Sequence, residues 1–266
     1  MQTENYRAIS IESASDLITL TLNRPEVRNA FNDTMIAEIS DFFGQLSEKS
    51  RHYRVVIITG SGNSFCAGAD LNWMKKMVDY SLEENLADSL KLAEMFRWIS
   101  ECPLPVLARV NGPAIGGGAG LVAVCDIAIA AESAVFGLSE VKLGLAPAVI
   151  SPYMIRKMGD RYCREYFLTG ERFSAARGAE IGLLNRVVPD KDLDQAVNEM
   201  VERLRTSGPN AIAACKTLLA GRSPADSRET DRFMAELIAR LRISDEAQEG
   251  MRAFLEKRKP SWHNRR

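Results

Sequence analysis

Short apolar runs and helical periodicities alternate along roughly the first 190 residues of the chain. Residues 17–22 (LITLTL) alternate apolar and polar side chains, which predicts a half-buried strand. The runs at 55–59 (VVIIT) and 106–110 (VLARV) are short and mostly apolar, as in buried strands. Residues 33–49 place apolar side chains at helical spacing, with Asp33 as the expected N-cap. This alternation predicts an α/β fold.

Helical patterns dominate the rest of the chain. Helical spacing covers residues 174–182, 191–206, 209–220 and 226–258. The sequence therefore predicts an α/β core over residues 1–200, which carries the active site, and a helical C-terminal region over residues 201–266. Few strands remain for the last helices to cover, so their apolar positions are expected to pack on the core or on a sister subunit.

Charge and composition exclude several classes of function. The 34 basic and 35 acidic residues give a net charge of −1, which argues against a broadly basic surface for nucleic acid. No apolar run reaches the length of about 18 residues that spans a bilayer, so no membrane association is expected. The N-terminus lacks a basic region followed by an apolar one, and the five cysteines form no CxxC pair. We therefore expect a cytoplasmic protein.

Histidines are too few for two common kinds of active site. His52 and His263 are the only two in the sequence. A zinc site or a Ser-His-Asp triad normally needs a firmly held histidine, and neither position suggests one. The sequence therefore predicts no metal site and no serine-hydrolase chemistry.

Two glycine-rich segments stand out as candidate binding loops. They are residues 64–71 (SFCAGADL) and 111–120 (NGPAIGGGAG), and each follows a predicted strand and leads toward a helix. The first N–H groups of a helix lack intrahelical partners, and glycine lets a ligand approach the backbone closely. Neither segment has the lysine of a Walker A loop, and residues 60–65 carry Phe65 where a dinucleotide fingerprint needs its last glycine. By themselves, the two segments remain open to interpretation as tight turns only.

The order of several separated motifs resembles the enoyl-CoA hydratase/isomerase (crotonase) superfamily. These motifs run from LNRPEVRNAF (22–31) through FCAGADL and NGPAIGGGAG to EGMRAFLEKRKPSW (249–262), nearly the whole chain. The resemblance implies a spiral of ββα units with C-terminal helices for trimerisation, as a homotrimer or homohexamer. It also implies an oxyanion hole made by the N–H groups of Ala69 and Gly117. Such donors stabilise the negative charge that develops on a thioester oxygen, and losing one typically costs ~10²–10³ in rate.

The same resemblance implies one catalytic carboxylate in place of the usual two. Hydratases of this family usually carry a glutamate just after the glycine triplet, where this chain has Gly120. Their second glutamate matches Glu140, which we expect to be the general acid/base, with an apolar wall raising its pKa. A double-bond isomerase can work with a single carboxylate, and so can a hydratase whose one glutamate makes both proton transfers. Dehalogenase-like, thioesterase-like and non-catalytic members of the family stay open as alternatives.

Finer resemblance favours a hydratase of a branched dicarboxylic thioester. The stretches GLSEVKLGLAPAVISPYMIRKMG and ISDEAQEGMRAFLEKRKPSW look like bacterial methylglutaconyl-CoA hydratases of leucine breakdown. Isohexenylglutaconyl-CoA hydratases of terpene breakdown share the single-glutamate pattern. Both substrates carry a second carboxylate, for which Lys75 and Lys76 are candidate partners; the alternative is that both are ordinary solvated lysines.

Coenzyme A is expected as part of the substrate, and no other cofactor is expected. By resemblance, the residues that contact CoA or substrate are Arg28, Ala67, Gly68, Asp70, Leu71 and Lys257. Lys257 would come from a neighbouring subunit. The basic tail around it can equally be a solvated surface segment.

Overall fold

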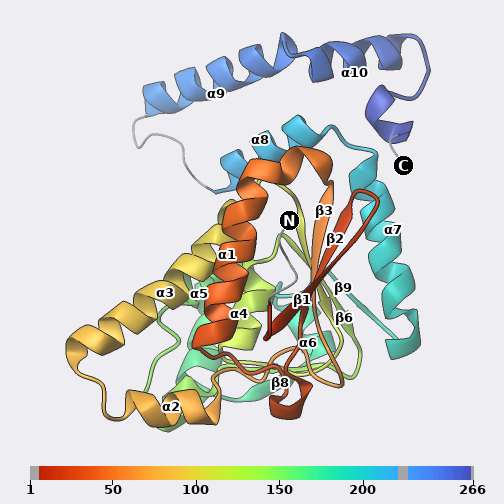
Figure 1. Ribbon diagram of the computed structural model, residues 1–266. Coiled ribbons are helices and arrows are strands. Elements are labelled where there is room, and N and C mark those ends of the chain that lie inside the picture. Colours follow the sequence, from red (N-terminus) through yellow and green to blue (C-terminus); the bar gives the residue numbers. More distant parts are fainter. Residues whose placement is uncertain (1–5, 221–226, 265–266) are drawn as a thin grey trace.

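The computed structural model describes residues 6–220 and 227–264 (Figure 1). A six-stranded sheet has the order β1-β2-β3-β4-β6-β9, in which β1 and β2 are antiparallel and the other neighbours are parallel. Its strands are β1 (Ile9–Ala14), β2 (Leu17–Leu22), β3 (Val55–Gly60), β4 (Val106–Val110), β6 (Ile127–Ala131) and β9 (Arg186–Val188). A second sheet has the order β5-β7-β8 and consists of β5 (Ala114–Ile115), β7 (Val135–Gly137) and β8 (Arg172–Ser174).

Helices cover both faces of the large sheet. The main core includes α1 (Asp33–Lys49), α3 (Leu82–Glu101), α4 (Gly117–Val124) and α5 (Ser151–Thr169). On the opposite face, α7 (Leu193–Arg205) packs its apolar side on Val55, Ile57 and Leu107. Because both faces are covered, all six residues of β3 are buried, as its apolar run predicts. The boundary predicted at residue 200 falls inside α7, which by its packing belongs to the core.

Most predicted elements are confirmed, with differences at their ends. The predicted N-cap Asp33 is wrong, because the Asn32 side chain accepts the Met35 N–H and Asp33 is the first residue of α1. The prediction of helix almost throughout the second part of the chain overlooks the short strands β8 and β9. The single helix predicted over 226–258 is two helices, α9 (Ser227–Arg242) and α10 (Asp245–Leu255), and residue 226 lies outside the described residues. Ser244 caps α10 and ends the continuous helix.

Of the C-terminal helices, α9 stands apart from the body of the molecule, whereas α10 is hydrogen-bonded to it (Figure 1). Glu246 of α10 accepts the N–H groups of Asn210 and Ala211, at 3.0 and 2.9 Å, in the first turn of α8 (Pro209–Leu219). Phe254 and Leu255 at the end of α10 are exposed in the single chain. Among the described residues, no helix has the length and apolar character needed to cross a membrane. Trimerisation through this region stays a prediction.

Candidate active site

The first candidate donor is the N–H group of Ala69. The Phe31 N–H donates to the Gly68 carbonyl at 2.7 Å, and the Asp70 N–H donates to the Phe31 carbonyl at 2.9 Å. In a trans peptide the C=O and N–H point in opposite directions, so the Ala69 N–H points away from Phe31. Within the described residues it has no hydrogen-bond acceptor, and Ala69 is exposed. This backbone group is therefore available to a ligand.

The second candidate donor is the N–H group of Gly117, the first residue of α4. The Gly116 carbonyl accepts the Gly120 N–H at 3.1 Å along the helix, so the N–H on the same peptide points out of the first turn. No side chain caps this helix start. The positive end of the helix dipole adds to the attraction for an oxyanion. Gly116 has φ 53° and ψ −121°, a backbone conformation that favours glycine.

The two donor loops pack directly on each other. The Ile115 N–H donates to the Cys66 carbonyl at 2.9 Å, and Cys66 and Ala114 form a parallel bridge. A Cβ added to Gly118 would lie 2.2 Å from the Cys66 carbonyl oxygen. Glycine is required here because the backbones of the two loops are in contact. This contact fixes the two donors relative to each other.

Glu140 lies beside the second donor. It belongs to the short 3-10 helix η3 (Ser139–Leu143), and its Oε1 would lie 2.9 Å from a Cβ added to Gly116. Its Oε2 is buried and has no hydrogen-bond partner among the described residues. Burial raises the pKa of Glu140, in the direction predicted from the sequence. The structure therefore brings the carboxylate predicted as acid/base next to the start of α4.

Ile150 occupies the place where the family's other glutamate would begin. A Cβ added to Gly120 would lie 2.3 Å from Ile150 Cγ2 and 2.7 Å from Ile150 Cβ. Ile150 is only 3% exposed, so it has little room to move aside. No side chain fits at position 120 in this packing. Nothing in the sequence marks Ile150, because its contact with Gly120 depends on how α5 docks on α4.

We expect Gly120→Ala to destabilise the fold, although alanine normally stabilises a helix relative to glycine by up to about 1 kcal/mol. The contact with Ile150 amounts to overpacking, which typically costs about 1–3 kcal/mol and exceeds that gain. Urea denaturation would measure the loss. Gly44→Ala in α1 is the matched control, because an added Cβ there meets nothing within 4 Å. Equal stability of the two variants would contradict this packing.

Of the remaining residues predicted to contact CoA or substrate, most lie at the first donor loop, but Lys257 does not. Arg28 is exposed, and its carbonyl accepts the Ala67 N–H at 3.0 Å, so both lie beside the first donor loop. Leu71, 74% exposed, begins α2 (Leu71–Met77). Asp70 is only 4% exposed and accepts hydrogen bonds within the protein, so it shapes the loop. Lys257 follows α10, at the opposite end of the molecule from α2, so a single chain does not bring it to this site (Figure 1).

Lys75 and Lys76 are exposed in the last turn of α2 and form no ion pair within the described residues. Cations at a helix C-terminus also stabilise the helix dipole, which is a sufficient structural reason for them. In residues 6–220 and 227–264, no three His, Cys, Asp or Glu side chains gather in a way that could hold a metal ion.

Asn29 is a supporting residue that the sequence reasoning missed. It is fully buried, has a positive φ of 56°, and donates from Nδ2 to the carbonyls of Ser61 and Ser64 at 2.9 and 2.8 Å. It thereby holds the start of the first donor loop against the chain that precedes α1. The available signal was modest: asparagine tolerates the left-handed conformation better than most residues.

Comparisons with known proteins agree along nearly the whole chain. Residues 12–265 match the family model described as enoyl-CoA hydratase/isomerase. Mevalonyl-coenzyme A hydratase sidH of Aspergillus fumigatus is 37% identical, over 92% of this chain and 91% of the relative. An enoyl-CoA hydratase crystal structure from Shewanella pealeana aligns with a TM-score of 0.93 at 38% identity, covering 98% of this chain and 100% of the other. Pseudomonas aeruginosa AtuE aligns with a TM-score of 0.93 at 32% identity, covering 97% and 100%.

Proposed function

We infer that this chain, which belongs to the enoyl-CoA hydratase/isomerase family, adds water across the double bond of an enoyl-CoA thioester. One observation carries the inference. Glu140 has a raised pKa, and its Oε2 has no hydrogen-bond partner among the described residues; it lies next to the helix start at Gly117, whose loop packs on the loop that carries the Ala69 N–H group. This arrangement suits a reaction that moves protons while negative charge develops on a carbonyl oxygen.

In the proposed reaction, the thioester oxygen accepts hydrogen bonds from the N–H groups of Ala69 and Gly117. The Glu140 carboxylate takes a proton from water as the water oxygen bonds to the β-carbon. The electron pair of the double bond moves toward the thioester and forms an enolate, which the two donors stabilise. Protonated Glu140 then gives its proton to the α-carbon, so that H and OH are both added and the carboxylate is restored. Position 120 supplies no acid, because Ile150 fills that space.

A double-bond isomerase is the competing function, and the Gly120–Ile150 contact favours it. A lone carboxylate can remove a proton from one carbon and return it to another through the same enolate, with no water consumed. The two functions use the same donors and the same Glu140. They differ in whether water lies within reach of that carboxylate.

For the acyl group, we propose 3-methylglutaconyl-CoA, in leucine catabolism. The support is the sequence resemblance around Glu140, together with a relative that acts on mevalonyl-CoA, whose acyl group also branches at C3. Isohexenylglutaconyl-CoA is the alternative substrate. Arg28, Ala67, Gly68 and Leu71 are proposed to contact CoA, with Asp70 shaping their loop and Lys257 supplied by a partner subunit in a cytoplasmic homotrimer or homohexamer.

A substrate panel tests the proposed function. Purified protein would be incubated with crotonyl-CoA, a 3-enoyl-CoA, 3-methylglutaconyl-CoA and isohexenylglutaconyl-CoA, and products would be separated by mass spectrometry. We expect a gain of one water and loss of the conjugated-enoyl absorbance, with the highest kcat/KM for 3-methylglutaconyl-CoA. Rapid double-bond migration without hydration of any thioester would establish the isomerase instead.

A further inference from the structure

Arg24 links the two backbone segments that hold the first donor peptide. Its Nη1 donates to the Ala30 carbonyl at 2.8 Å, and its Nη2 donates to Asp70 Oδ2 at 2.8 Å. The Arg24 and Asp70 side chains are only 17% and 5% exposed. One guanidinium thus ties the residue before Phe31 to the residue after Ala69.

These two anchor points flank the contact that orients the donor. Phe31 exchanges both backbone hydrogen bonds with the residues on either side of Ala69, through the Gly68 carbonyl and the Asp70 N–H. The two hydrogen bonds of the Arg24 guanidinium therefore connect the same two segments as this pair of backbone bonds. Because the guanidinium is planar and its donors are fixed, it sets both the spacing and the angle between the segments.

The donor peptide needs this external support. Gly68 has φ +92°, and a Cβ added there would lie 2.9 Å from the Ile115 carbonyl oxygen, so position 68 offers no side chain to hold the Gly68–Ala69 peptide. Ala69 has only a methyl group, and it is exposed. The orientation of the Ala69 N–H therefore depends on its neighbours.

Both partners in the ion pair are themselves held in place. Asp70 Oδ1 accepts the Asn72 N–H at 2.7 Å at the start of α2. Burial opposes charge on Asp70, but the hydrogen bonds from Asn72 and Arg24 keep its pKa below the ordinary value. The Arg24 N–H donates to Asn29 Oδ1 at 2.9 Å, and Asn29 is fully buried. The pair is thus a fixed part of the loop.

We propose that Arg24 is a positioning residue for the oxyanion hole, acting through Ala30 and Asp70 to aim the Ala69 N–H at the thioester oxygen. The inference rests on the proposed function only in placing that oxygen between the two donors. It does not require that water be added. Its guanidinium is bonded to Ala30 and Asp70 within the protein, so the proposed role is positioning and not catalysis.

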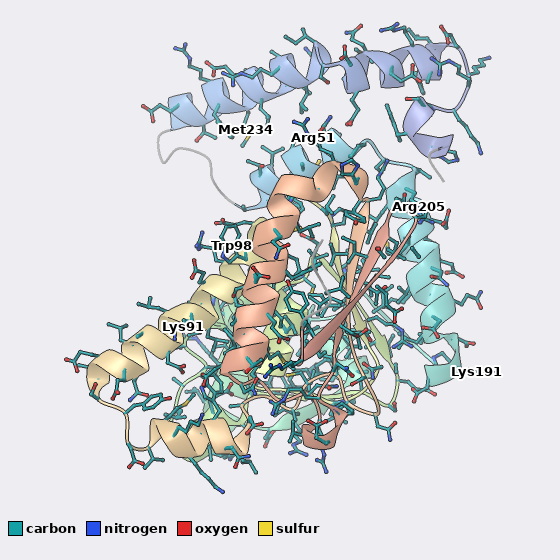
Figure 2. All side chains as sticks on the ribbon, in the orientation of Figure 1. Arg51, Lys91, Trp98, Lys191, Arg205 and Met234 are labelled. Carbon is teal, nitrogen blue, oxygen red and sulfur yellow. The ribbon has the colours of Figure 1, made fainter. Side chains whose placement is uncertain are left out.

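The decisive variant is Arg24→Lys, which keeps the charge but loses the fork that reaches both acceptors. We expect kcat to fall about ten- to a hundredfold with little change in KM, a smaller loss than the ~10²–10³ for losing a whole donor. Arg205→Lys is the matched control: Arg205 forms a partly buried ion pair with Asp16 and lies at the end of α7 (Figure 2). The control should keep its kcat.

Two ligands distinguish a loss of oxyanion positioning from a general loss of structure or binding. Acetoacetyl-CoA can bind as its enolate, whose near-ultraviolet absorbance reports charge on the thioester-side oxygen, whereas butyryl-CoA has no conjugated group to polarise. We expect Arg24→Lys to weaken the enolate absorbance of bound acetoacetyl-CoA and to leave the Kd for butyryl-CoA unchanged. Circular dichroism would confirm that the variant is folded.

The inference is overturned if Arg24→Lys keeps both wild-type kcat and wild-type enolate absorbance, or if butyryl-CoA binding falls by the same factor as kcat. Should Arg24→Lys not fold, Arg24→Gln decides by the same two ligands, since its single amide group reaches at most one of the two acceptors and carries no charge. A wild-type protein that hydrates nothing yet shows the enolate absorbance would refute the proposed hydratase without touching the role of Arg24.

Discussion

Glu140→Gln is expected to reduce kcat toward the upper end of the ~10²–10⁴-fold range typical of general acid–base catalysis. The reason is that Ile150 fills the space at position 120, and in the proposed reaction Glu140 makes both proton transfers. Glutamine has nearly the same shape but cannot accept the proton from water. KM should change little, because the proposed CoA contacts do not include Glu140. Steady-state hydration of the best substrate in the panel would measure the effect.

Glu132→Gln is the matched control, because Glu132 is exposed and lies between β6 and β7, outside the site. It should keep wild-type activity. If Glu140→Gln retains that activity as well, the assignment of Glu140 as acid/base is wrong.

The same Glu140→Gln variant should be more stable than the wild type at neutral pH. Since burial raises the pKa of Glu140, the folded protein holds this proton more tightly than the unfolded chain does. The contribution of Glu140 to the free energy of unfolding is therefore largest below the ordinary pKa of 4.5. It is lost as pH rises through the raised pKa of the folded protein. A neutral glutamine side chain would escape that loss. Thermal unfolding at about pH 8 and about pH 4 should show a higher Tm for the variant only at the higher pH.

Gly117→Pro should reduce kcat by ~10²–10³, the usual effect of removing one oxyanion donor. Proline lacks the N–H group, yet it is tolerated at the first position of a helix, where Gly117 lies. The substitution therefore removes the donor while leaving the rest of α4 able to form. Single-turnover kinetics with the substrate bound would isolate the chemical step.

Gly117→Ala supplies the control for shape. It keeps the N–H group and adds a Cβ that would lie 3.2 Å from the Phe31 ring, a close contact that proline would also make. The ratio of the alanine and proline rates thus removes the effect of the Cβ and reports the replacement of the N–H group by the proline Cδ at the oxyanion position. Equal rates for the two variants would contradict the assignment of the Gly117 N–H as a donor.

The elements that could be predicted from the sequence are those with their own local pattern. The strands at 17–22 and 106–110 coincide with β2 and β4, because their periodicity or continuous burial shows in the residues themselves. β8 and β9 have three residues each, too few for any period to appear, and their pairing with distant strands decides their conformation. The crotonase-like fold expected from the order of motifs is confirmed by the structural neighbours.

The site likewise contains residues that the sequence could identify and residues that it could not. Ala69, Gly117 and Glu140 could be selected because each lies in a contiguous motif, and the structure places their segments in contact. Ile150 and Arg24 could not be selected as site residues, since what they do depends on which chain segment docks against them. An isoleucine or an arginine carries no local sign of such a contact.

The contact between Gly120 and Ile150 also limits how this protein can change over time. A glutamate at position 120 cannot arise productively by one substitution, because its first side-chain carbon has no space. A smaller residue at position 150 would have to come first, and by itself that substitution would leave a cavity in the core. Position 150, which carries no candidate catalytic group, therefore decides whether a second carboxylate can be introduced at position 120.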